Sequence, residues 1–258
     1  MELSGYRIVV TGSARGMGAA TVRAFVAAGA NVVGMDLEAQ SGQRVAEEAT
    51  RSGPGVASFR QVDIADAADV TRVFDSAVES LGWLDVLAHP AAIQRPGNAA
   101  EVPVADWDQM MAVNVRGTML TNQAAYRHMA PRGRGAIINF GSVSGLRPEP
   151  GAPAYSASKG AVHSWTRTAA AAWGSDGIRV NAILPAIATP MYEEAKERMA
   201  EDEMTAHYWR NEYSIAMGQR YGDPDQDLGP VMVFLASEGA RFITGQLIPV
   251  DGGQTSVR

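Results

Sequence analysis

Tyr155 and Lys159 stand four residues apart in the segment PAYSASKGAV, which runs from Pro153 to Val162. On a helix, positions i and i+4 share one face, so the phenol and the ammonium would be neighbours. A positive charge close to a tyrosine favours its ionised form and lowers its pKa. The spacing therefore allows two interpretations, an ordinary surface pair or a tyrosine that exchanges a proton inside a cleft.

The second interpretation is energetically feasible. A useful base at neutral pH needs the tyrosine pKa of ~10 to fall by roughly 3 units, or about 4 kcal/mol. A unit positive charge about 4 Å away supplies about 4 kcal/mol at an effective dielectric constant near 20, although burial of the phenol works against this gain. Lys159 can thus activate Tyr155 if a bound cofactor and a hydroxyl such as Ser142, 13 residues earlier, complete the site.

A glycine-rich turn, TGSARGMG, follows the short β-branched segment RIVVT and precedes a helical pattern. Its glycines allow a tight turn and let a pyrophosphate approach the backbone, where the helix N-terminus offers free N–H groups and a partial positive charge. A plain strand-to-helix turn is the alternative, because such a motif needs context. The turn residues expected to contact a dinucleotide are Gly12, Arg15, Gly16, Met17 and Gly18.

Two acidic strand ends supply that context. Asp36 ends the second strand, NVVGMD, where a carboxylate can accept hydrogen bonds from both hydroxyls of an adenosine ribose and would repel a 2′-phosphate. This position predicts NAD, whereas Arg15 in the glycine turn favours NADP as the alternative. Asp63 and Ile64 close the third strand and can contact the adenine; alternatively, Asp63 only caps the next helix.

Short apolar segments alternate with helical patterns along the whole chain, which predicts a parallel sheet covered on both faces. We expect one α/β domain over residues 1–258, a doubly wound seven-stranded parallel sheet with helices on both faces. The expected strands are 7–11, 31–36, 56–63, 84–89, 135–141, 178–184 and 246–253. The expected helices are 16–28, 40–51, 66–80, 104–129, 153–173, an irregular stretch over 190–217, and 227–237.

The composition excludes several classes of function. Hydrophobic residues make up 46% and charged residues 19%, a normal globular balance, and the net charge of -6 disfavours nucleic acid and anionic membrane surfaces as partners. The absence of cysteine excludes disulfides, thiolate catalysis and Cys-ligated metals, and no metal site is expected. Neither a secretory signal nor a membrane-spanning segment is visible, so we expect a soluble, cytoplasmic protein.

Taken in order, these motifs resemble the short-chain dehydrogenase/reductase family over essentially the whole chain. The matching segments are TGSARGMG, NVRG (Asn114 to Gly117), INFGSVSG (Ile138 to Gly145), YSASK, IRVNAILPA (Ile178 to Ala186) and ITGQLIPVDGG (Ile243 to Gly253). The resemblance implies a Rossmann-type fold and an NAD(P)-dependent oxidoreductase that interconverts a secondary alcohol and a ketone. It also implies a homotetramer or homodimer.

The resemblance assigns roles to individual residues. Tyr155 would be the general acid/base, Ser142 would hydrogen-bond the reacting oxygen, and Lys159 would bind the nicotinamide ribose and lower the tyrosine pKa. Asn114 would hold a water in a proton relay, or kink its helix, or both. The remaining implied cofactor contacts are Pro90 and Ala91 near the ribose, and Pro185, Ile187 and Thr189 around the nicotinamide amide, with helix capping as the alternative for Thr189.

The chain departs from the family pattern at two places. His-Pro-Ala-Ala at residues 89–92 replaces the usual Asn-Asn-Ala-Gly, and Pro185–Ala186 replaces the common Pro-Gly. Pro90 lacks a backbone N–H and Ala92 makes a positive φ costly, so we expect a different brace beside a retained cleft. For His89 we favour a buried, hydrogen-bonded structural role over a role in proton relay.

Residues 189–218 correspond to the family's substrate lid and hold four methionines and four of the chain's tyrosine and tryptophan residues. Such side chains suit an apolar ligand, so we expect an apolar cyclic or aromatic alcohol or ketone. The alternative is that they pack the lid onto the core or a neighbouring subunit. The candidate substrate contacts are Met191, Tyr192, Tyr208 and Trp209.

Two other classes of protein remain as alternatives. A non-catalytic dinucleotide-sensing relative would lose the tyrosine, the lysine or the glycine turn, and this chain keeps all three. A lyase or dehalogenase relative without cofactor would lose the glycine turn and replace Lys159. Neither description matches this sequence.

Overall fold

A computed structural model describes residues 2–255, apart from the side chains of Pro190, Met191, Ala195 and Arg210. This part of the chain forms one seven-stranded parallel sheet in the order β3-β2-β1-β4-β5-β6-β7. The doubly wound α/β fold expected from the sequence is confirmed. The strands are β1 Arg7–Thr11, β2 Asn31–Asp36, β3 Val56–Gln61, β4 Val86–His89, β5 Gly135–Phe140, β6 Ile178–Pro185 and β7 Leu247–Val250.

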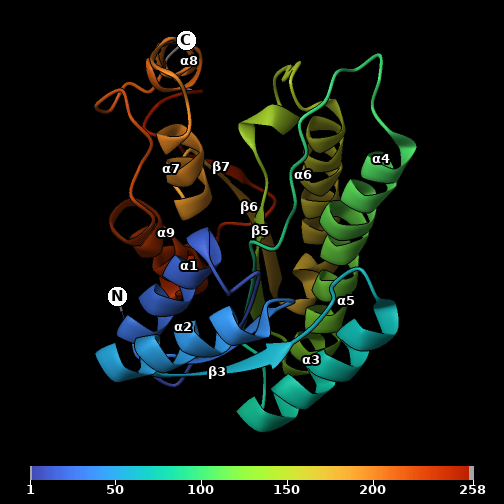
Figure 1. The fold of residues 1–258 in the computed structure, drawn as a ribbon. Coiled ribbons are helices and arrows are strands. Elements are labelled where there is room, and N and C mark those ends of the chain that lie inside the picture. Colours follow the sequence, from blue (N-terminus) through green and yellow to red (C-terminus); the bar gives the residue numbers. More distant parts are fainter. Residues whose placement is uncertain (1, 256–258) are drawn as a thin grey trace.

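Helices cover both faces of this sheet (Figure 1). Side chains from α1, α2 and α9 form the hydrophobic core on one face, and side chains from α3, α5 and α6 form the core on the other. Central strands buried on both sides explain why their sequences are continuous apolar runs rather than alternating patterns. The helices on the sheet are α1 Gly16–Ala27, α2 Ala39–Ser52, α3 Ala67–Leu81, α5 Gly117–Met129, α6 Pro153–Trp173 and α9 Gly229–Ala236.

The structure differs from the expected helices at three places. The long helix expected over 104–129 consists of α4 (Val104–Met110), a π-helical stretch (Met111–Arg116) and α5. Another π-helical stretch, Pro224–Leu228, precedes α9. The irregular helical region separates into α7 (Pro190–Glu197), α8 (Glu201–His207) and a π-helical turn (Tyr208–Glu212).

The strand order changes direction at β1, which has β2 on one side and β4 on the other. The loops that leave these two strands meet there, because a Cβ on Gly12 would lie only 2.7 Å from the Cα of Ala91. Ligands of open α/β sheets bind at such a switch point, outside the carboxyl ends of the strands. A ligand site is therefore expected at the loops after β1, β2, β3 and β4.

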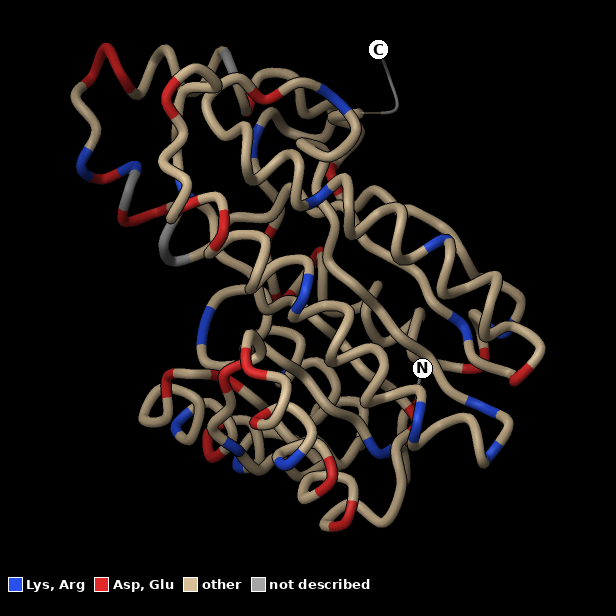
Figure 2. Tube along the Cα trace, turned by 90° about the vertical axis from the view of Figure 1, so that its right-hand side faces the viewer, with Lys and Arg blue, Asp and Glu red and all other residues tan. Residues whose placement is uncertain are grey.

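The charged residues of the chain are mixed over its surface. Figure 2 shows lysine and arginine residues interspersed with aspartate and glutamate along the tube. Among the helices of residues 2–255, none combines the length and apolar character needed to cross a membrane.

Candidate functional site

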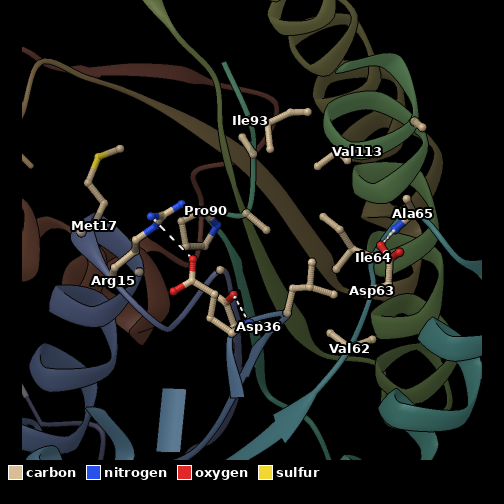
Figure 3. Close-up of a pocket in the computed structure, with 18 of the residues that line it drawn as sticks. Arg15, Met17, Asp36, Val62, Asp63, Ile64, Ala65, Pro90, Ile93 and Val113 are labelled. Atoms are coloured by element: carbon tan, nitrogen blue, oxygen red, sulfur yellow. Dashed lines mark hydrogen bonds and ion pairs between the residues drawn. The ribbon is translucent and has the colours of Figure 1, made fainter. Parts of the chain in front are cut away.

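A cleft of about 570 Å³ opens at the carboxyl ends of the strands (Figure 3). Most of the residues predicted to contact a dinucleotide line it. They are Gly12, Arg15, Gly16, Met17, Gly18, Asp36, Asp63, Ile64, Pro90, Ala91 and Thr189. The other four predicted contacts, Tyr155, Lys159, Pro185 and Ile187, are not among the lining residues. Tyr155 and Lys159 lie on α6, Pro185 ends β6, and Ile187 is buried in the hydrophobic core.

The glycine turn fits a pyrophosphate group. Gly12 and Gly16 have φ angles of +58° and +53°, which side chains rarely adopt, and a Cβ on Gly18 would lie 1.9 Å from the carbonyl oxygen of Gly12. Helix α1 starts here without a side-chain cap and without an acidic residue in its first turn. In the described residues its N-terminus thus has no side-chain cap and no acidic residue of its own first turn, so an anion can bind its first N–H groups.

Asp36 lies at the end of β2 and organises the neighbouring turn. Its Oδ2 accepts a hydrogen bond from the Ala14 N–H at 2.9 Å, and its Oδ1 accepts one from the Glu38 N–H at 3.0 Å. Arg15 pairs with Glu38, with 3.5 Å between Nη1 and Oε1. Two carboxylates therefore lie at the position expected for the adenosine ribose, and the one cation of the glycine turn is already paired with one of them.

Asp63 and Ile64 face Asp36 and Arg15 across the cleft (Figure 3). The Asp63 carboxylate accepts a hydrogen bond from the Ala65 N–H at 2.9 Å. The alternative role of Asp63 as a helix cap is wrong, because Asp66 caps α3 by accepting from the N–H groups of its first turn. Asp63 is exposed and keeps capacity to accept a further hydrogen bond.

Ser142, Tyr155 and Lys159 come together after β5 and on the first turns of α6. The Ser142 side chain lies near enough to Tyr155 to lower the pKa of the phenol, while Ser142 Oγ accepts from the Ser144 N–H at 3.1 Å. Lys159 is buried, its Nζ lies 5.5 Å from the centroid of the Tyr155 ring, and it donates to the Phe140 carbonyl at 2.8 Å. The structure thus brings the predicted hydroxyl, phenol and ammonium into one group.

The pKa values of this group follow its burial. Burial raises the pKa of Tyr155 above its usual value, and the hydrogen bond with Ser142 partly opposes that rise. Burial lowers the pKa of Lys159 to about 8. Lys159 is not among the causes of the Tyr155 pKa shift, which are burial and Ser142; its Nζ lies over the ring face and donates to a backbone carbonyl.

Asn114 lies in the π-helical stretch and is buried. Its side chain exchanges two hydrogen bonds of 2.8 Å with the Ile93 backbone and donates to Ser158 Oγ at 3.0 Å. The main-chain carbonyl accepts from Thr118 Oγ1 at 2.7 Å. The side chain therefore braces the segment after β4 against α6, and the role of Asn114 in a water relay stays a prediction.

His89 is the last residue of β4 and stands where the family usually has an asparagine. Its Nδ1 lies 2.7 Å from Thr11 Oγ1 and 3.2 Å from Thr121 Oγ1, and the residue is 2% exposed. Burial, helped by the positive charge of Lys159, lowers the pKa of His89 to about 3. This agrees with the structural role favoured from the sequence and with a locally different brace beside a retained cleft.

Sequence reasoning missed a second buried histidine. His163 accepts a hydrogen bond from the Ser142 backbone N–H at 3.2 Å through Nε2. The available signal was spacing, because residues 155, 159 and 163 follow one another at intervals of four on α6. Such spacing places all three side chains along one face of the helix.

The predicted substrate contacts of the lid lie in different surroundings. Thr189 both lines the cleft and caps α7, since its Oγ1 accepts from the Tyr192 N–H at 3.3 Å. The Tyr192 hydroxyl binds Glu212, and Tyr192 lines a second cavity together with Thr189. The Tyr208 hydroxyl donates to Gln219, and its ring packs against that of Trp209, which is 59% exposed. The side chain of Met191 lies outside the described residues, and contact of these four residues with a substrate stays a prediction.

Comparison with known proteins is consistent over the full length of the chain. A family model described as enoyl-(acyl carrier protein) reductase matches residues 12–255. Galactitol 2-dehydrogenase (L-tagatose-forming) of Cereibacter sphaeroides is 40% identical, with 98% of this chain and 96% of the relative covered. The 2-(S)-hydroxypropyl-CoM dehydrogenase 3 of Xanthobacter autotrophicus is 36% identical, with 97% and 96% covered. A solved structure described as a putative short-chain alcohol dehydrogenase from Sinorhizobium meliloti superposes with a TM-score of 0.89 at 33% identity, covering 98% of this chain and 97% of that one.

Proposed function

The chain belongs to the short-chain dehydrogenase/reductase family, and on this premise we propose that it is an NAD-dependent enzyme that interconverts a secondary alcohol and its ketone. Membership implies an oxidoreductase with a nicotinamide cofactor. The observation that carries the proposed chemistry is the contact of Ser142 with Tyr155 beside the buried Lys159.

In the proposed oxidation, Tyr155 Oη takes the proton of the substrate hydroxyl, and Ser142 Oγ hydrogen-bonds the same oxygen. Bound NAD supplies a hydride acceptor for the carbinol carbon. Because burial raises the pKa of Tyr155, the phenol needs added stabilisation of its anion before it acts as a base. Ser142 supplies part of it, and the single positive charge of Lys159 at the ring supplies another part once the site is closed to water.

The preference for NAD rests on the adenosine end of the cleft. Asp36 and Glu38 place two carboxylates there, and the Arg15 guanidinium is paired with Glu38 rather than left for a phosphate. A 2′-phosphate would bring like charge beside these groups, which disfavours NADP. The pairing of Arg15 with Glu38 supports the preference for NAD over the alternative from Arg15, although the pair is exposed and so contributes little energy.

The substrate is proposed only as a secondary alcohol or ketone. The expectation of an apolar cyclic or aromatic substrate rests on lid side chains that lie in mixed surroundings: Tyr192 lines a cavity but binds Glu212, and Trp209 packs against Tyr208 but is largely exposed. Two similar proteins are named as dehydrogenases of galactitol and of 2-(S)-hydroxypropyl-CoM, so polar alcohols belong in any test.

The test is a screen at 340 nm with NAD and NADP against a panel of apolar, cyclic and polyhydroxylated secondary alcohols. We expect turnover with NAD on at least one alcohol and loss of that turnover in Tyr155→Phe, with NADH binding retained. Unchanged turnover in Tyr155→Phe would exclude the proposed base, and equal efficiency with both cofactors would exclude the argument from Asp36.

A further inference from the structure

His163 lies one helical turn after Lys159, and its ring is buried under the loop that carries Ser142. Its Nε2 is 3.2 Å from the backbone nitrogen of Ser142, which donates the hydrogen bond. Among the described residues, His163 has no hydrogen bond to Tyr155 and does not line the cofactor cleft. It acts instead on the backbone of Ser142, whose side chain lies near Tyr155.

The loop of residues 141–145 is folded closely around this ring. A Cβ on Gly141 would lie 2.4 Å from His163 Nε2, and a Cβ on Gly145 would lie 2.6 Å from its Cε1. Real Cβ atoms do not approach other atoms this closely, so glycine is required on both sides of the imidazole. Between these two glycines, Ser142 adopts an extended backbone and its Oγ accepts from the Ser144 N–H at 3.1 Å.

The hydrogen bond defines the state of the ring. Nε2 can accept from a backbone N–H only with a free lone pair, so the proton of the neutral imidazole is on Nδ1. Burial lowers the pKa of His163 to about 4, the positive charges of Lys159 and Arg167 act in the same direction, and the Gly145 carbonyl opposes them. The ring therefore remains an acceptor throughout the neutral pH range.

We propose that His163 is a positioning residue of the oxidoreductase site, whose neutral Nε2 holds the Ser142 backbone so that the Ser142 hydroxyl stays beside Tyr155. This inference rests on the proposed function. The hydroxyl and the backbone N–H belong to the same residue, so fixing the N–H limits the rotation of the peptide that carries Oγ. Without the acceptor, the N–H is left unpaired beside an apolar side chain. An unpaired buried donor costs free energy, which favours a displaced loop in which the N–H finds another partner.

The proposal predicts a specific change in acid–base behaviour. The hydrogen bond from Ser142 lowers the pKa of Tyr155, so a displaced Ser142 leaves that pKa higher. In alcohol oxidation the tyrosine must be deprotonated, so the acid limb of the kcat–pH profile moves to higher pH. One hydrogen bond of this kind corresponds to roughly a tenfold effect, which is a shift of about one pH unit or less.

The experiment compares His163→Leu, which removes the acceptor, with His163→Gln, whose amide oxygen can accept the Ser142 N–H. For an alcohol identified in the screen, we expect His163→Leu to lower kcat by roughly tenfold and to shift the acid limb upward. The dissociation constant of NADH should not change, and His163→Gln should recover most of kcat and of the original pH limb. Equal kcat values and equal pH limbs in the two variants would overturn the proposal.

A double-mutant cycle separates positioning from packing. In a Ser142→Ala background the hydroxyl is gone, so His163→Leu should cause little further loss of kcat. An equal loss with and without Ser142 would overturn the proposal. Val162→Ala is the matched packing control, because Val162 is the neighbouring buried residue of the same helix; we expect a lower melting temperature without a shift of the pH limb.

The outcome can be distinguished from failure of the proposed function. The pKa of Tyr155 can be measured without any substrate, as the ultraviolet titration difference between a protein and its Tyr155→Phe counterpart. If no alcohol is oxidised, the proposed function fails, while a higher Tyr155 pKa in His163→Leu still supports the positioning role. An unchanged Tyr155 pKa in that variant overturns the positioning role whether or not an alcohol is found.

Discussion

Replacement of His89 by asparagine tests the altered brace at the end of β4. The imidazole is 2% exposed, and its Nδ1 meets the hydroxyls of Thr11 and Thr121. Burial and the charge of Lys159 lower the pKa of His89 from 6.5 to about 3. An asparagine side chain can also hydrogen-bond these hydroxyls, but it has no charge to gain in acid.

The sign of the effect follows from linkage. The pKa of His89 is lower in the folded protein than in the unfolded chain, so below pH 6.5 the unfolded chain binds a proton that the folded protein does not. The stability contributed by a neutral His89 is fully present above pH 6.5 and is lost as the pH falls toward about 3. Between pH 8 and pH 5 this loss amounts to about 2 kcal/mol.

The assay is urea unfolding of the wild type and His89→Asn at pH 8 and pH 5. We expect the free energy of unfolding of the variant minus that of the wild type to be about 2 kcal/mol larger at pH 5 than at pH 8, because only the wild type loses the contribution of His89. His163 and the acidic residues are common to both proteins, so their contributions cancel in this comparison. A difference that is the same at both pH values would refute a neutral, buried His89.

Two further predictions concern the cofactor cleft. Asp36→Asn keeps an acceptor for the Ala14 N–H but removes the negative charge that repels a 2′-phosphate. The ratio of kcat/KM for NAD to that for NADP should therefore fall roughly tenfold, corresponding to about 1–2 kcal/mol of lost repulsion. An unchanged ratio would show that other residues determine the cofactor selectivity. Gly18→Ala places a Cβ 1.9 Å from the Gly12 carbonyl oxygen and should weaken NADH binding at least tenfold by fluorescence titration. Gly174→Ala, where a Cβ has open space, is the control and should bind NADH as the wild type does.

Most of the fold could be predicted because its strands are buried on both faces. β1, β2 and α6 have the expected bounds, since β-branched runs end at glycine or acidic turn residues and Pro153 starts a helix that has no further proline before Trp173. The π-helical stretch at Met111–Arg116 could not be predicted, because six residues are too short to separate a wider helix from an ordinary one by periodicity. Its cause is tertiary, since it accommodates the contacts of Asn114 with Ile93 and Ser158.

The site was predictable where backbone geometry determines the residue type. Glycine at positions 12 and 18 follows from close contacts, and Asp36 follows from its place at a strand end. The partner of Arg15 could not be predicted, because Glu38 reaches it only through the turn after β2. The lid was interpreted from its composition, and composition does not show which way Trp209 points or that Tyr192 would bind Glu212.

The two buried histidines and Lys159 are best understood together. The positive charge of Lys159 contributes to the low pKa of both His89 and His163, so each ring stays neutral while the lysine carries the charge. Because burial already brings the pKa of Lys159 to about 8, a second positive charge nearby would promote loss of its proton. Neutral imidazoles can instead supply hydrogen bonds, His89 to the threonine hydroxyls and His163 to Ser142, without adding charge. This division explains how a site that needs one ammonium beside Tyr155 can also hold two histidines.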